Sequence, residues 1–192
     1  MSDQKYSLDD LITLMARLRD PKDGCPWDLK QNYRSITPST LEESYEVVDA
    51  IEREDYDHLK EELGDYLFQA VFYCQLAKED GFFDLNEVVD QLTAKLIRRH
   101  PHVFPNGTLE SRAGDEKKAE EEIKASWEKI KWEERAGKGS AGVLDDVPRA
   151  LPALSRAAKL QKRASQVGFD WQDKQGVLEK IKEELVELDH AM

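Results

Sequence analysis

Residues 63–77 read LGDYLFQAVFYCQLA, and a helix made of them carries apolar side chains on nearly every side. A helix that is apolar all round is normally buried all round. One small bundle cannot surround such a helix completely, so we expect part of its apolar surface to contact a second subunit. The side chains expected to contribute to that interface are Leu67, Phe68, Val71 and Phe72.

The sequence on both sides of this stretch also favours helices. Capping residues mark four expected helix starts: Ser7, residues 39–42, Asp57 and Asp84. A strongly charged segment at 115–136 is expected to form a fifth helix. The predicted fold class is therefore all-α, with a dimeric helical bundle domain at residues 1–136.

Four carboxylates are spaced to meet between two of these helices. Glu43 and Glu46 share one helix face because they are three residues apart, and Glu62 and Asp65 share a face of the next helix. If the helices pack antiparallel, the carboxylates come together and repel one another unless a cation neutralises them. Such oxygen ligands suit Mg²⁺ or Mn²⁺, and Mg²⁺ is usually held by a few carboxylates together with substrate phosphates. Acidic helix faces are common on solvated surfaces, so Glu43 and Glu46 alone would indicate little. The second pair, Glu62 and Asp65, is what favours a metal-dependent enzyme.

Three other residues near these helices have a functional and a structural interpretation. Gly64 costs about 1 kcal/mol relative to Ala inside a helix, which indicates either a close approach of two helix backbones or a packing requirement alone. Trp27 and Gln31 either contact a nucleobase or close the first loop.

Two groups of residues are candidates for substrate binding. Lys95, Arg98 and Arg99 lie near one face of a helix, where they either bind phosphates or pair with the excess carboxylates of the chain. Trp127 and Lys131 are one helical turn apart, which suits a ring that stacks on a base beside a phosphate-binding cation. The alternative for Trp127 is an ordinary place in the core.

Composition excludes several other classes of function. The chain has 192 residues, 35% of them charged, and a formal net charge of -12, which argues against binding of polymeric nucleic acid. Its two cysteines form no Cys-x-x-Cys pair, so a zinc site or a disulfide framework is not expected. No signal peptide or membrane-length apolar segment is present. These observations predict a cytoplasmic protein with reduced thiols and no membrane contact.

The C-terminal part of the sequence partly repeats the N-terminal part. Residues 168–171 are similar to 24–28, and residues 183–187 are similar to 42–46, but no second Glu-x-x-Asp pair follows. We therefore expect a linker at 137–150 and an incomplete second repeat at 151–192, without a catalytic site of its own.

The combined pattern resembles the MazG-type nucleoside triphosphate pyrophosphohydrolases. The matching segments, in the order of the family, are residues 24–28, 40–46, 61–65, 95–104 and 127–131. The resemblance implies an all-α fold that dimerises. It also implies Mg²⁺-dependent cleavage of nucleoside triphosphates, with Mn²⁺ as a second candidate ion, to a nucleoside monophosphate and pyrophosphate.

The resemblance also implies roles for individual residues. The metal ligands would be Glu43, Glu46, Glu62 and Asp65, and Glu42 would assist from the second shell or at a water. The substrate-binding residues would be Lys95, Arg98, Arg99, Trp127 and Lys131. A narrower enzyme, for example one that prefers deoxynucleotides or modified bases, is one alternative. A catalytically weak helical dimer that binds nucleotide or a protein partner is another.

Overall fold

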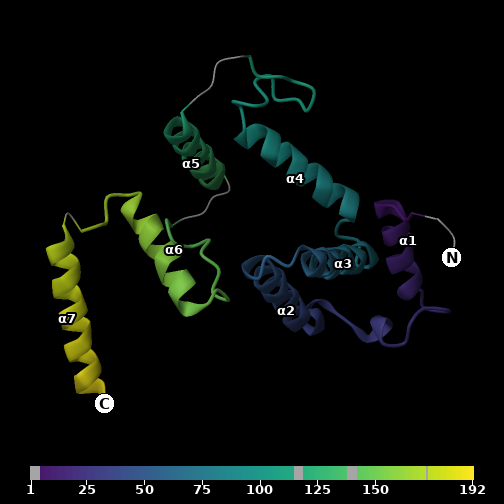
Figure 1. Cartoon of the computed structure of the whole chain (residues 1–192), viewed down its shortest axis with the longest axis horizontal. Coiled ribbons are helices and arrows are strands. Elements are labelled where there is room, and N and C mark those ends of the chain that lie inside the picture. The colour runs from purple at the N-terminus through teal and green to yellow at the C-terminus, as the bar shows by residue number, and fades with distance from the viewer. Residues whose placement is uncertain (1–4, 115–118, 138–141, 172) are drawn as a thin grey trace. The chain divides into compact units, whose positions relative to one another are not determined.

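The computed structural model of the protein describes residues 5–114, 119–137, 142–171 and 173–192 (Figure 1). All regular secondary structure within these ranges is helical, which confirms the predicted fold class. The contacts divide the chain into two units, residues 1–114 and 115–192. No helix in the described ranges is both long and apolar enough to cross a membrane.

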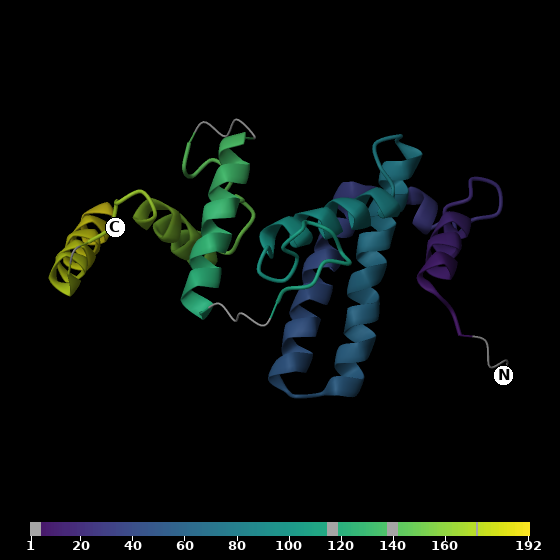
Figure 2. The same ribbon diagram turned by 90° about the horizontal axis from the view of Figure 1, so that it is seen from above.

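The first unit is built around a helical hairpin. Its elements are α1 (Leu8–Leu18), a 3-10 turn η1 (Asp28–Lys30), α2 (Tyr33–Glu52), α3 (Tyr56–Glu79) and α4 (Leu85–Arg99). The helices α2 and α3 lie side by side and antiparallel, as Figure 2 shows, and share the most extensive helix contact of the unit. The helix α1 packs on α3, and α4 begins beside the C-terminal end of α3.

The core of this unit lies at one end of the hairpin. It consists of the side chains Met15, Ile36, Val71, Phe72 and Leu76. Val71 and Phe72 are only 2% and 1% exposed, so both belong to the core of a single chain. Of the four side chains expected at a subunit interface, only Leu67 is exposed, and Phe68 is half-buried.

The helix α2 begins earlier than the sequence predicted. Asn32 caps it, because its side-chain oxygen accepts hydrogen bonds from the backbone N–H groups of Arg34 and Ser35. The expected start at residues 39–42 is therefore wrong, and these residues lie inside the helix even though Pro38 precedes them. The cap at Asn32 already satisfies the first N–H groups, so the helix needs no second start.

The turn between α2 and α3 contains an unusual backbone conformation. Glu54 has a φ of 55° and is the only residue other than glycine with positive φ in the described part of the chain. Its N–H donates to the carbonyl of Ile51, and the N–H of Asp55 donates to that of Ala50, the pattern of a Schellman motif. Asp55 then caps α3 by accepting from the N–H of His58, so the expected cap at Asp57 is wrong. The predicted starts at Ser7 and Asp84 are confirmed.

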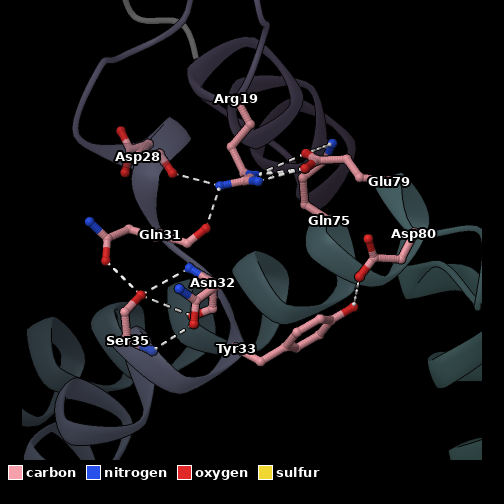
Figure 3. A network of polar contacts seen from close by, with 9 residues as sticks. All are labelled: Arg19, Asp28, Gln31, Asn32, Tyr33, Ser35, Gln75, Glu79 and Asp80. Atoms are coloured by element: carbon pink, nitrogen blue, oxygen red, sulfur yellow. Dashed lines mark hydrogen bonds and ion pairs between the residues drawn. The ribbon is translucent and has the colours of Figure 1, made fainter.

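Arg19 joins three segments at the core end of the hairpin (Figure 3). Its Nε and Nη2 atoms donate to the Glu79 carboxylate at 2.6–3.0 Å, and its Nη1 donates to the carbonyl of Asp28 at 2.6 Å. The guanidinium also lies 5.4 Å from the centre of the Phe72 ring. The loop between α1 and α2 is thereby tied to the C-terminal end of α3.

The same loop requires Gly24 and uses Gln31 as a structural residue. A Cβ atom at Gly24 would lie 2.4 Å from the carbonyl oxygen of Asp20. The Gln31 side chain donates to the carbonyl of Trp27 and accepts from the Ser35 hydroxyl. Gln31 therefore closes the loop, whereas the Trp27 side chain is 63% exposed.

The second unit contains the helices α5 (Glu120–Gly137), α6 (Ala153–Ser165) and α7 (Lys174–Ala191). Glu128 of α5 pairs with Lys162 and accepts a hydrogen bond from Gln166, which joins α5 to α6. Within the predicted linker Val147 is buried, and Asp146 pairs with Arg163 of α6 at 2.9 Å. Residues 115–118, where the charged helix was expected to begin, and 138–141 of the expected linker lie outside the described ranges.

Large apolar side chains of the second unit are exposed. They include Leu154, Phe169, Trp171, Leu178, Ile181 and Leu185. Both α6 and α7 lack a fully buried residue in the structure as described. The linker at 137–150 and the second repeat at 151–192 stay predictions.

Candidate metal centre

Three carboxylates meet between α2 and α3. Glu43 comes from α2, and Glu62 and Asp65 lie one turn apart on α3. Each offers one oxygen atom, and these three oxygens lie within 4.8 Å of one another. The antiparallel packing of the hairpin thus brings one predicted ligand of α2 to both predicted ligands of α3.

The electrostatic environment of Glu43 reflects this crowding. Burial raises the pKa of the Glu43 carboxyl, and the negative charges of Asp65, Glu46, Glu62 and Glu42 raise it further. The other four carboxylates expected from the sequence therefore all act on Glu43. Because like charges at short range resist ionisation, a nearby positive charge would stabilise the ionised form of these carboxylates.

Glu42 and Glu46 occupy the edge of this group. Both side chains are exposed, and neither belongs to the set of oxygens within 4.8 Å that the described residues form. Their charges still reach Glu43. Of the four predicted metal ligands, the structure brings three together and leaves Glu46 beside them.

Glu62 is the most deeply buried member of the cluster and has a partner that the sequence analysis missed. Its residue is 8% exposed. Its Oε1 atom lies 3.2 Å from Nδ1 of His58, which is one turn earlier on α3. The spacing of four residues was visible in the sequence, but histidines at this spacing from a glutamate are common on helix surfaces.

The chemistry of this donor set fits a hard divalent cation. The three meeting side chains offer only carboxylate oxygens, which are the ligands that Mg²⁺ and Mn²⁺ prefer. A dication would also relieve the repulsion that raises the pKa of Glu43. The cluster thus has both the ligand type and the excess negative charge of a metal site.

Gly64, between Glu62 and Asp65 in sequence, does not serve a close approach of helices within one chain. A Cβ atom built at this position would meet nothing within 4 Å. The interpretation of Gly64 as a contact point between the two helix backbones of one chain is therefore wrong.

The helix α4 carries the basic residues that the sequence predicted at the substrate. Lys95, Arg98 and Arg99 occupy the last turns of α4. Figure 1 shows that α4 leads away from the α2–α3 hairpin instead of running back along α3. The carboxylates and these cations thus lie on different helices of the first unit.

Trp127 and Lys131 lie together on α5 of the second unit. The Lys131 ammonium is 4.6 Å from the centre of the Trp127 ring and 3.4 Å from Oε1 of Glu128. Trp127 is exposed, which argues against the alternative of a core tryptophan. The two side chains are thus arranged as the motif predicted, but they belong to a different unit from the carboxylates.

Comparison with known proteins places these features in a family. Residues 31–104 match the model of the MazG nucleotide pyrophosphohydrolase domain, and this range contains α2, α3 and the carboxylate cluster. The chain is 52% identical over 181 residues to a nucleoside triphosphate pyrophosphohydrolase of Escherichia coli (strain K12). It is 44% identical over 191 residues to the nucleoside triphosphate pyrophosphohydrolase/pyrophosphatase MazG of Thermotoga maritima.

The extent of each match is also informative. The aligned region covers 94% of this chain and 66% of the Escherichia coli relative, so the chain spans just under two thirds of that protein. The region aligned with the Thermotoga maritima relative covers 100% of this chain and 69% of that relative. The crystal structure of a mazG-related protein from Thermotoga maritima matches 65% of this chain and 99% of its own, with a TM-score of 0.52 and 27% identity.

Proposed function

Because the chain belongs to the MazG family of nucleotide pyrophosphohydrolases, we propose that it hydrolyses nucleoside triphosphates to a nucleoside monophosphate and pyrophosphate. Attack by water would break the bond between the α and β phosphates. The observation that carries the proposal is the meeting of Glu43, Glu62 and Asp65 between α2 and α3. Relatives that carry this activity in their names support it.

In this proposal the cluster holds Mg²⁺, with Mn²⁺ as the alternative ion. Glu43, Glu62 and Asp65 would be ligands, and Glu46 is the candidate for a fourth. When bound, the cation would neutralise phosphate charge and make a water more acidic. The protein itself contributes preorganised carboxylates on two packed helices, and Glu42 would assist from beside the ligands or at a water.

The substrate's phosphates would be bound by the basic residues of α4, and its base by Trp127. Lys95, Arg98 and Arg99 offer charge-assisted hydrogen bonds to phosphate. Lys131, beside Trp127, offers a further cation. An alanine substitution at Trp127 is expected to raise KM more than it lowers kcat, because the base lies away from the scissile bond.

We also propose a homodimer formed through the hairpin. Exposed apolar side chains follow α2 and α3, namely Leu41, Tyr45, Val48, Ile51, Leu63, Tyr66 and Leu67. Exposed apolar side chains on both helices of the hairpin favour burial in a subunit interface. Light scattering of the full chain at micromolar concentration tests this, and a stable monomer would contradict it.

Pyrophosphate release from the common nucleoside and deoxynucleoside triphosphates, with and without Mg²⁺, tests the proposed activity. Glu62→Gln and Asp65→Asn should each abolish most of the turnover, because each removes a charged ligand while keeping the size of the side chain. Glu52→Gln, on α2 but outside the cluster, is the matched control and should leave turnover unchanged. Unchanged turnover in both cluster variants would refute the site. Nucleotide binding without turnover would favour the alternative of a catalytically weak binding protein.

We assign no catalytic site to the incomplete repeat. Glu183 and Glu184 both pair with Lys180 of the same helix, at 2.6 and 3.1 Å. Glu184, the counterpart of Glu43, thus pairs with a cation of its own helix, whereas Glu43 faces other carboxylates. Glu184→Gln is therefore expected to leave turnover unchanged, and a large loss would show that this segment takes part.

A further inference from the structure

We infer that His58 is a positioning residue that holds the Glu62 carboxylate in place for the cation. The inference rests on the proposed metal site. His58 Nδ1 lies 3.2 Å from Glu62 Oε1, and the two side chains are 35% and 10% exposed. His58 is the one partner at ion-pair distance that the described structure gives to the most buried carboxylate of the cluster.

The position of His58 is itself fixed by the helix start. Its backbone N–H donates to the Asp55 side chain at 3.1 Å, which places His58 in the first turn of α3. Residues four apart on a helix share a face and helical side chains lean toward the N-terminus, so the Glu62 carboxylate reaches back toward the ring of His58. A rigid series of contacts therefore leads from the turn between the helices to the cluster.

Such a contact is needed because Glu62 faces two other carboxylates. Repulsion from Glu43 and Asp65 favours rotation of Glu62 away from them, and burial makes an unpartnered carboxylate costly. The polar ring nitrogen of His58 opposes that rotation. Contacts that orient a metal ligand in this way typically change metal affinity by about 10–100-fold when they are lost.

Binding of Mn²⁺ to the full chain, followed by the electron paramagnetic resonance signal of the free ion, tests this role without requiring turnover. His58→Leu keeps a similar volume but removes the ring nitrogen, and it should weaken Mn²⁺ binding by about 10–100-fold. His58→Asn places an amide group where Nδ1 lies and should recover most of that loss. His190→Leu, on α7 of the second unit, is the matched control and should bind as the parent does.

The outcomes separate a positioning role from a merely structural one. A His58→Leu variant with parental affinity would overturn the inference, and so would an Asn variant as weak as the Leu variant. Circular dichroism of the metal-free proteins should show that both variants keep the parental helicity. Glu62→Gln, measured in parallel, should also lose affinity. If Glu62→Gln keeps the parental Mn²⁺ affinity, the cluster is not the metal site, and the proposed function is refuted together with the inference. If Glu62→Gln loses Mn²⁺ affinity but His58→Leu does not, only the role of His58 is refuted.

Discussion

Replacing Arg19 with Met should strongly destabilise the first unit. The Arg19 side chain is 8% exposed and its partner Glu79 is 34% exposed, so water can solvate Glu79 in part after the change. Methionine retains much of the apolar stem but none of the donors. The loss is therefore confined to the polar contacts and to the contact with the ring of Phe72.

The size of the effect follows from these contacts. The hydrogen bond to the Asp28 carbonyl contributes about 1 kcal/mol. The ion pair with Glu79 contributes about 1–2 kcal/mol, below the value for a fully buried pair because one partner is solvated. The contact with Phe72 adds about 0.5 kcal/mol. We expect a total loss of about 3 kcal/mol in the free energy of unfolding, which lowers the melting temperature of a unit of this size by about 10–20 °C.

Urea unfolding of the full chain, followed by circular dichroism, measures this loss. Arg17→Met is the matched control, because Arg17 is exposed on the same helix, and it should change stability by less than about 0.5 kcal/mol. A loss below about 1 kcal/mol in Arg19→Met would refute the assignment of Arg19 as the residue that joins the three segments.

The effect should also depend on pH. Burial by itself would raise the pKa of Glu79, but hydrogen bonds from Arg19 and Gln75 and the charge of Arg19 lower it below its ordinary value. A lowered pKa in the folded state stabilises the protein above the ordinary range of a glutamate, and this contribution is lost as the pH falls through the lowered pKa. The difference between parent and Arg19→Met should therefore be full at neutral pH and should shrink in acid. A difference that grows in acid would contradict this account.

Three further predictions concern the hairpin. Glu54→Gly should stabilise the protein by about 0.5–1 kcal/mol, because glycine adopts positive φ without strain, and a lower melting temperature would contradict this. Gly64→Ala should also stabilise it by about 0.5–1 kcal/mol, because the added methyl group meets no atom within one chain. A loss of stability there would mean that a second subunit packs against Gly64. Glu43→Gln should raise the melting temperature of the metal-free protein at neutral pH. Because the pKa of Glu43 is raised in the folded state, the contribution of this carboxyl to stability is full in acid and is lost as the pH rises. The gain in melting temperature from Glu43→Gln should therefore disappear at about pH 4. An equal gain at neutral pH and at about pH 4 would refute this prediction.

The sequence was sufficient to predict the cluster but not its surroundings. Glu43 meets Glu62 and Asp65 because helical spacing and antiparallel packing leave little choice once both helices exist. The start of α2 was missed because Pro38 breaks most helices, whereas here Asn32 had already established the first turn.

Other features depend on tertiary contacts that periodicity does not contain. A helix that is apolar all round does not indicate which of its sides faces α1 and which faces a partner, so Val71 and Phe72 were assigned to an interface although they form the core. The packing of Leu85, in the first turn of α4, against the core is likewise a tertiary contact that the periodicity of α4 does not reveal. His58 was missed because only its distance from a buried carboxylate distinguishes it from a surface histidine.

The location of the core has a mechanical consequence for the cluster. Met15, Phe72 and Arg19 fix the hairpin near the C-terminal end of α3, while Glu62 lies 10 residues before Phe72 on the same helix, or about 15 Å at 1.5 Å per residue. Over such a distance, a tilt of about 2° between α2 and α3 changes the separation of the carboxylates by about 0.5 Å. The turn at residues 53–55 closes the other end of the hairpin, so both ends limit such a tilt and with it the range of cation radii that the cluster can hold.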